Sequence, residues 1–326
     1  MTGKHSLCLA AAAALALVVA PARAQTPAAA SGTTLITLGT AGGPLPRPDR
    51  AQSSNLLVVN GTLYLIDTGG GVTGRVVQSG YNFRNANKIF ITHIHSDHTD
   101  GLATLLNSQW ENQPKEPTDI YGSGVEPLLK GAMAYLDPNV EIRYSEGKKR
   151  SMAETFHAHE VQPGVIYQDA NVKVTAVENT HFHFQPNDPA YGKYKSYSYR
   201  FETPDRVVFF TGDTGPSEAV VELAKGADLY VTETTSPEGV IEVFKKNGVW
   251  DSKTQAEKDG FLRHMHEEHV TPADIGKMAA KAGVKSVVMT HLGPSVDPKT
   301  EYPAYVEEAK KFYSGPITVA TDLMKF

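Results

Sequence analysis

His93-Ile94-His95-Ser96-Asp97-His98 places four potential metal ligands within six residues. The stretch follows residues 88–92, a short apolar run that predicts a strand. If the chain stays extended, His93 and His95 point the same way, and Asp97 and His98 lie on the next turn. Imidazole and carboxylate ligands suit zinc, with manganese or iron as alternatives. One catalytic tetrahedral ion cannot take all four ligands and keep an open position, so the stretch predicts two neighbouring ions.

Four later apolar segments also lead to a His, Asp or Glu. They are residues 171–177 before His181, 206–211 before Asp213, 228–232 before Glu233, and 284–290 before His291. Ligand sites in α/β folds gather at the carboxyl ends of strands, so we expect these side chains to meet the first cluster. Two alternatives stay open: His183 competes with His181, and Asp213 has the composition of an ordinary turn residue.

The order of elements predicts an α/β (α+β) fold with mixed sheets. Residues 55–59 and 62–66 flank Asn60-Gly61, which is typical of a hairpin with a type I′ turn. Thr271-Pro272-Ala273-Asp274 predicts a helix start, and the helix should end at Gly283. No linker or internal repeat divides residues 33–326, which we interpret as a single domain. Residues 109–163 suggest an insertion that roofs the site.

The first residues are typical of a targeting segment. An apolar run, residues 7–20, follows Lys4 and precedes Ala22-Arg23-Ala24, a small-x-small cleavage site. We predict a signal peptide over residues 1–24, a flexible tail over 25–32, and a periplasmic or secreted protein without a stable membrane anchor. The alternative is an anchor that is not cut. The single cysteine, Cys8, lies in this segment, so any metal must be held by His and carboxylate groups alone.

The charge of the chain argues against a polyanionic partner. The formal net charge is −5, and loss of Lys4 and Arg23 with the signal peptide would make it −7. Because nucleic-acid affinity comes mainly from basic groups that neutralise phosphates, we predict no nucleic-acid partner.

The sequence resembles the metallo-β-lactamase fold superfamily, whose signature is His-x-His-x-Asp-His. Other motifs resemble its branch with ribonuclease Z and the zinc arylsulfatases: Leu38-Gly39-Thr40-Ala41-Gly42, Ser53-Ser54-Asn55, Leu65-Ile66-Asp67-Thr68-Gly69, Thr211-Gly212-Asp213, Thr232-Glu233-Thr234-Thr235, His269-Val270-Thr271 and Thr290-His291. The resemblance implies an αββα sandwich of two mixed sheets with outer helices.

The resemblance also implies roles for individual residues. The resemblance implies two zinc ions. One would be held by His93, His95 and His181, and the other by Asp97, His98 and His291. Asp213 would bridge both. His269 paired with Glu233 would protonate the leaving group, or alternatively only brace the site. Asp97 counts as a catalytic candidate as well as a ligand. Asp67 would orient a ligand imidazole.

We therefore predict an exported two-metal hydrolase that uses a metal-bridging hydroxide on aryl sulfate esters or phosphodiesters. The expected substrate is a small-molecule ester, and the resemblance implies a homodimer. One alternative is a lactonase or β-lactamase-type hydrolase of a carbonyl bond, and another is a metal- or ligand-binding protein without turnover. Four further histidines are interpreted as rim or loop residues: His157, His159, His264 and His266.

Overall fold

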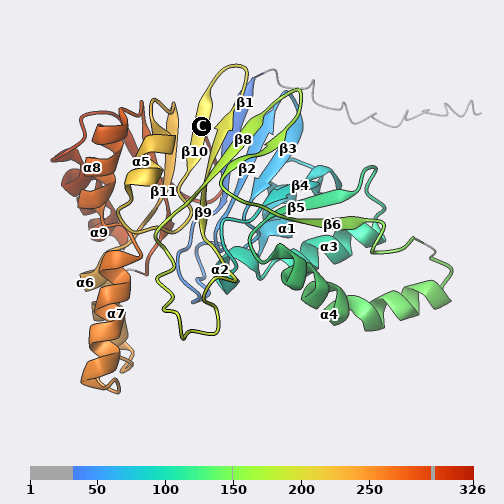
Figure 1. Cartoon of the computed structure of the whole chain (residues 1–326), viewed down its shortest axis with the longest axis horizontal. Helices are drawn as coiled ribbons and strands as arrows, with labels where there is room; N and C mark the ends of the chain where they lie inside the picture. The colour runs from blue at the N-terminus through green and yellow to red at the C-terminus, as the bar shows by residue number, and fades with distance from the viewer. Residues whose placement is uncertain (1–31, 149, 295–297) are drawn as a thin grey trace, which may run out of the picture.

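The computed structural model describes residues 32–148, 150–294 and 298–326. The predicted signal peptide over residues 1–24 lies outside the described residues, and only Gly32 of the predicted tail lies within them. Two mixed β-sheets face each other and helices cover their outer faces (Figure 1). The predicted αββα sandwich is therefore confirmed.

Each sheet has seven strands among the described residues. The first sheet runs, in spatial order, through β14 (Met324–Lys325), β1 (Thr33–Gly39), β2 (Ser54–Val59), β3 (Thr62–Ile66), β4 (Lys88–Phe90), β5 (Thr118–Gly122) and β6 (Phe156–Glu160). The second runs through β13 (Ile317–Val319), β12 (Val287–Leu292), β11 (Leu229–Thr234), β10 (Val207–Phe210), β9 (Tyr197–Glu202), β8 (Lys173–Glu178) and β7 (Gly164–Gln168). Both sheets contain parallel and antiparallel pairs.

The helices lie in three groups. On the first sheet are α1 (Val72–Gln78), the 3-10 turn η1 (Phe83–Asn85), α3 (Leu102–Glu111) and α4 (Val125–Ser145). On the second are α5 (Glu218–Ala224), α8 (Pro272–Ala282) and α9 (Pro298–Lys310). The short α2 (Ser96–Thr99) follows β4, and α6 (Pro237–Lys246) and α7 (Gln255–Glu267) lie together at one end of the molecule (Figure 1).

Alternating side chains of the strands separate the core into layers. Leu35 and Leu57 face the space between the sheets, whereas their neighbours Ile36 and Leu56 face the outer helices. Successive side chains of a strand point to opposite faces, so a strand with both faces covered is apolar throughout. This burial explains why the strands are continuous apolar runs in the sequence.

Two local predictions are confirmed. β2 and β3 pair as a hairpin, and Asn60 and Gly61 between them have φ values of 49° and 84°, as a type I′ turn requires. Thr271 and Asp274 form a capping box at the start of α8. That helix ends at Gly283 in the left-handed conformation.

The structure corrects the interpretation of residues 109–163 as a roof. They contain β5, α4 and β6, and β5 and β6 complete the first sheet beside β4. His157 and His159 are likewise not loop residues, because both lie on β6, where they contact Asp119. Phe156 is the one buried residue of this edge strand, so the segment lacks the apolar run by which the other strands are recognised.

Candidate metal centre

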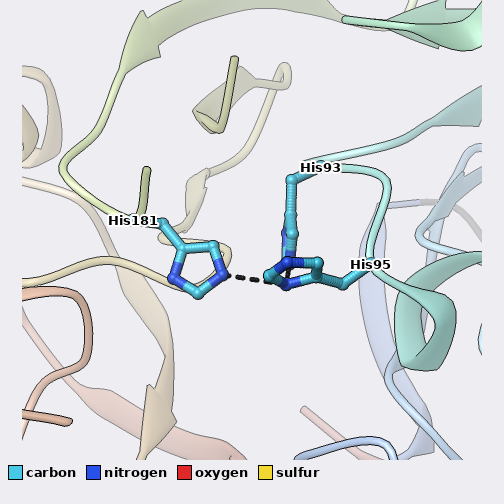
Figure 2. A group of neighbouring side chains, drawn as sticks. All are labelled: His93, His95 and His181. Atoms are coloured by element: carbon cyan, nitrogen blue, oxygen red, sulfur yellow. Dashed lines mark hydrogen bonds between the residues drawn. The ribbon is translucent and has the colours of Figure 1, made fainter. Parts of the chain in front are cut away.

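Three histidines from two sheets meet at one point. Figure 2 shows His93 and His95, which follow β4, opposite His181, which follows β8. The Nδ1 atom of His95 lies 3.1 Å from Nε2 of His93 and 3.1 Å from Nε2 of His181. His93 and His181 are fully buried, whereas His95 is exposed and marks the open side of the group.

A second group lies beside the first and joins α2 to β12. Nε2 of His291 is 3.0 Å from Oδ2 of Asp97, and Nε2 of His98 is 3.6 Å from the same oxygen. All three residues are buried. The residues of this group come from opposite ends of the chain.

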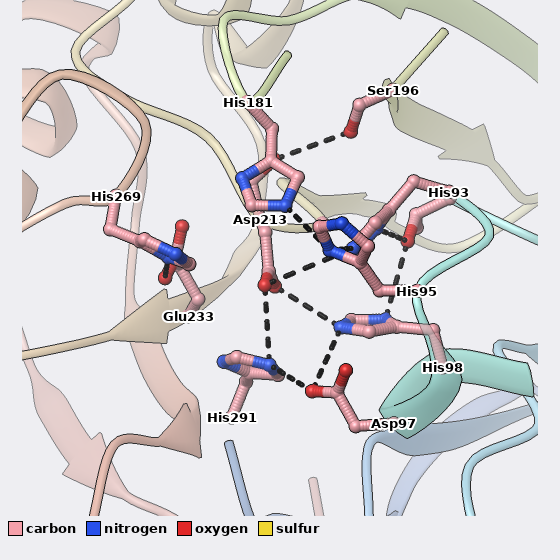
Figure 3. Close-up of polar contacts among 12 residues, drawn as sticks. His93, His95, Asp97, His98, His181, Ser196, Asp213, Glu233, His269 and His291 are labelled. Carbon is pink, nitrogen blue, oxygen red and sulfur yellow. Dashed lines mark hydrogen bonds and ion pairs between the residues drawn. The ribbon is translucent and has the colours of Figure 1, made fainter. Parts of the chain in front are cut away.

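Asp213 lies between the two groups (Figure 3). Its Oδ1 is 3.4 Å from Nε2 of His98, and its Oδ2 is 3.3 Å from Nε2 of His291 and 4.0 Å from Nε2 of His93. Asp213 follows β10 after Gly212, whose φ of 59° turns the chain back toward the site. The structure thus brings all seven predicted ligands together.

The protonation of the first group fits a bound cation. His181 donates from Nδ1 to the carbonyl of Glu268 at 2.9 Å, so its Nε2 carries a lone pair. Nδ1 of His95 faces two such nitrogens and can donate to only one of them. Burial lowers the pKa of His93 and of His181 well below the usual value, which keeps both imidazoles neutral.

The second group shows unmatched buried atoms. Nδ1 of His98 lies 2.9 Å from Oδ2 of Asp67, which leaves Nε2 to face Oδ1 of Asp213. Neither Nε2 of His98 nor Oδ1 of Asp213 has a hydrogen-bond partner in the part of the chain that the structure describes. Burial opposes a charged His98, but the charges of Asp213, Asp67 and Asp97 raise its pKa well above the usual value. The same negative charge would favour a metal ion, so the residues fit one.

Glycines of the sequence motifs let the backbone approach these ligands. A Cβ atom on Gly42 would lie 2.6 Å from the carbonyl oxygen of His291 and 2.7 Å from its Nδ1. A Cβ atom on Gly69 would lie 2.3 Å from the carbonyl oxygen of Asp97. The Leu-Gly-Thr-Ala-Gly and Asp-Thr-Gly motifs therefore support the backbone of the ligand cluster.

Glu233 and His269 form a buried pair beside the cluster (Figure 3). Nδ1 of His269 lies 2.6 Å from Oε2 of Glu233, whose Oε1 accepts from the backbone N–H of Thr214 at 2.6 Å. Burial would lower the pKa of His269, but the charge of Glu233 and this hydrogen bond raise it to about 9. His269 is therefore placed to hold a proton next to His181, from which its ring centroid is 5.0 Å away.

Two residues at this site were missed or underestimated. The interpretation of His264 as a rim residue omits its contact with the buried pair, because its Nε2 lies 3.2 Å from Nε2 of His269. Glu268 holds Nδ1 of His264 at 2.8 Å and supplies the carbonyl that orients His181. Neither residue follows a strand, so the sequence pattern contained no signal for them. His183 is exposed near Glu267 and takes no part in the cluster.

Fold and site together define a metal-dependent hydrolase. The chain belongs to the beta-lactamase superfamily, because it matches that superfamily's domain over residues 62–292.

The chain is similar to ribonuclease Z of Mycobacterium bovis (strain BCG / Pasteur 1173P2), with 27% identity over 292 residues, covering 88% of this chain and 96% of the relative. Among solved structures it is similar to the metallo-β-lactamase fold protein YhfI from Bacillus subtilis, with a TM-score of 0.63, 17% identity, and coverage of 91% and 100%. It is also similar to the short form of human tRNase Z, with a TM-score of 0.61, 21% identity, and coverage of 90% and 98%. The predicted resemblance to the ribonuclease Z branch is confirmed.

These relatives contradict several predictions. The relatives are named as ribonucleases and a tRNase. These names conflict with three predictions: an aryl sulfate hydrolase, a small-molecule ester substrate and the absence of a nucleic-acid partner. Net charge averages over the whole surface, whereas local charge around a site determines whether phosphates approach it. The same relatives support neither a carbonyl-bond hydrolase nor a protein without turnover.

The predicted periplasmic or secreted location is contradicted by the same relatives. It depended on residues 1–24, and a short apolar run before small residues is only a pattern of composition. No helix within the described ranges is long and apolar enough to cross a membrane.

Proposed function

We propose that this protein is a two-metal phosphodiesterase that hydrolyses RNA, and that residues 33–326 form the single domain that carries the activity. The names of its relatives suggest the substrate. The observation that supports the proposal is the buried Glu233–His269 pair beside a cluster of seven potential ligands. Such a pair supplies a proton, which an RNA leaving group needs.

The two ions that we assign are zinc, because the ligands are imidazoles and carboxylates without thiolate. One ion would be held by His93, His95 and His181, the other by Asp97, His98 and His291, and Asp213 would contact both. When bound, such ions lower the pKa of a water molecule and neutralise charge on phosphoryl oxygens. Asp97 would therefore contribute to catalysis as a ligand.

His269 would act as the general acid. Cleavage of the P–O bond leaves an alkoxide on the ribose, which is a poor leaving group until it receives a proton. The Nδ1 atom of His269 faces Glu233, so the proton for that oxygen is the one on Nε2, which lies 3.2 Å from Nε2 of His264. Glu233 holds the imidazole in place and favours its charged form, since its carboxylate lies 2.6 Å away.

An assay of RNA cleavage tests the proposal. Purified protein would be incubated with an unstructured RNA, a tRNA transcript with extended ends and a DNA of the same sequence. Cleavage of RNA that needs a divalent metal and is strongly slowed by His269→Ala supports the proposal. Failure to cleave any RNA, by protein that holds about two metal ions per chain, would overturn it.

A further inference from the structure

The loop between β8 and β9 places two phenyl rings at the metal centre. Phe182 follows His181 directly, and its ring centroid lies 5.2 Å from that of His95 and 5.7 Å from that of His93. Phe184 stacks on Phe182, with centroids 4.8 Å apart and an interplanar angle of 29°. Phe182 is also tilted by 32° against His181 at a centroid distance of 5.1 Å, so the two phenyl rings adjoin a predicted ligand one after the other.

Core packing does not account for these rings. Both are partly exposed, and within the described ranges neither belongs to a hydrophobic cluster or packs against one. Tyr194 of the same loop differs, because its ring packs against Gly124. Phe182 and Phe184 thus keep an apolar flat surface at the edge of the site, which costs solvation free energy unless something covers it.

The loop carries one lysine that could meet a phosphate, beside the exposed Asp188 of the same loop. Lys193 is exposed, and its ammonium has no ion-pair partner among the residues described. Lys195 pairs with Glu178 at 2.7 Å. Aromatic side chains beside basic ones are the usual means of binding single-stranded nucleic acid, because every base has a flat face and every nucleotide a phosphate.

We propose that Phe182 and Phe184 form a stacking platform for the nucleobase next to the scissile phosphate. This inference rests on the proposed function. The ring of Phe182 contacts the imidazoles that would hold the metal, and Phe184 stacks on that ring, so a base attached to the nucleotide at the metal centre is the one that reaches them. Stacking on a phenyl ring discriminates little between bases, so the platform would position the strand without reading its sequence.

Phe184→Leu is the variant that tests the platform, because Leu stays apolar but has no flat face. Among the ring contacts of the described residues, Phe184 meets Phe182 and no predicted ligand, so the metal content should not change. Phe184→Tyr keeps a flat ring and should restore function. Phe312→Leu is a matched control, since Phe312 is 45% exposed and contacts Lys277 of α8, outside the site.

The kinetic arm compares a ribodinucleotide with two analogues that lack the base on one side or the other of the phosphodiester. For the unchanged protein, loss of the stacked base should lower kcat/KM by roughly 10-fold or more. Phe184→Leu should lower kcat/KM for the intact dinucleotide by a similar factor. For this variant, removal of the stacked base should then lower kcat/KM little further. An equal effect of Phe184→Leu on the intact dinucleotide and on both analogues would overturn the platform.

A binding arm works without turnover. 2-Aminopurine ribonucleoside 3′- and 5′-monophosphates should lose fluorescence on binding to the unchanged protein, Phe184→Tyr and Phe312→Leu, but not to Phe184→Leu. Equal quenching by Phe184→Leu, or none by the unchanged protein, would refute the platform. If no dinucleotide is cleaved at all, the proposed function fails, and the binding arm still decides whether a base stacks here.

Discussion

Asp67→Asn is the change that tests the metal centre most directly, because His98 is the one predicted ligand that Asp67 hydrogen-bonds among the described residues. Oδ2 of Asp67 accepts from Nδ1 of His98 at 2.9 Å, and Oδ1 accepts from the backbone N–H of Thr92 at 2.8 Å. In the variant, the amide oxygen keeps the Thr92 bond, and the amide NH2 faces Nδ1 of His98. Two donors cannot pair, so His98 either loses its partner or moves its proton to Nε2, the nitrogen predicted to bind metal.

The structure limits the expected loss to one ion. Removal of a carboxylate that orients a ligand imidazole typically costs 10- to 100-fold in metal affinity, which corresponds to about 1.4–2.7 kcal/mol. His98 belongs to the group with Asp97 and His291. Within the described ranges the other group meets Asp67 only through Thr92, whose Oγ1 lies 3.1 Å from Nδ1 of His93, so its ion should lose much less affinity.

The assay is a titration with a competing chelator, followed by elemental analysis of the metal that remains. Asp67→Asn should lose one ion at a lower chelator concentration than the unchanged protein and then retain about one ion per chain. Asp119→Asn is the matched control, because Asp119 accepts from the surface residue His159 at 2.8 Å. Unchanged affinity for both ions, or equal weakening of both, would refute this role of Asp67.

Other predictions follow from the same geometry. His269→Ala should lower kcat by roughly 10²–10⁴-fold on RNA but much less on a nitrophenyl diester, whose leaving group needs no proton; equal slowing would argue against a general acid. Activity should fall as pH rises above about 9, because the acid form of His269 is then lost. Glu233→Gln removes the charge that raises this pKa, so the alkaline limb of kcat/KM should move to lower pH, and an unmoved limb would contradict the assignment. Gly42→Ala would bring a Cβ atom to 2.6 Å from the His291 backbone and should lower both metal content and activity. Chelation should lower Tm, and added zinc should restore it. At a free zinc concentration 100 times Kd, binding should add about 2.7 kcal/mol to the free energy of unfolding. A Tm that does not respond would show that no metal stabilises the fold.

The sequence was informative where local chemistry decides structure. Strands that are buried on both faces must be apolar throughout, so residues such as those of β2 and β12 could be recognised. The turn at Asn60-Gly61 and the cap at Thr271 are set by single side chains. Side chains that follow such strands could therefore be placed at one edge, and the structure brings them together there.

Contacts between distant residues determine the strand ends and register shifts that the sequence does not predict. β4 ends at Phe90 and not at Thr92, because the side chain of Asp67 takes the N–H of Thr92. His291 lies within β12 and not after it, with φ of 42°, where the pairing with β11 shifts its register. Glu233 likewise lies within β11. None of these features has a periodic pattern, because each depends on residues far away in the chain.

The pairing of Asp97 with His291 joins residues that are 194 positions apart. A ribosome makes the chain from its N-terminus, so the His93–His98 segment exists long before the C-terminal residue that completes its site. During synthesis the first half carries predicted ligands without their partners, and the complete cluster cannot form until the last strands of the second sheet have emerged and docked. Under the proposed function, the chain would be inactive toward the messenger RNA being translated until its own synthesis is almost finished.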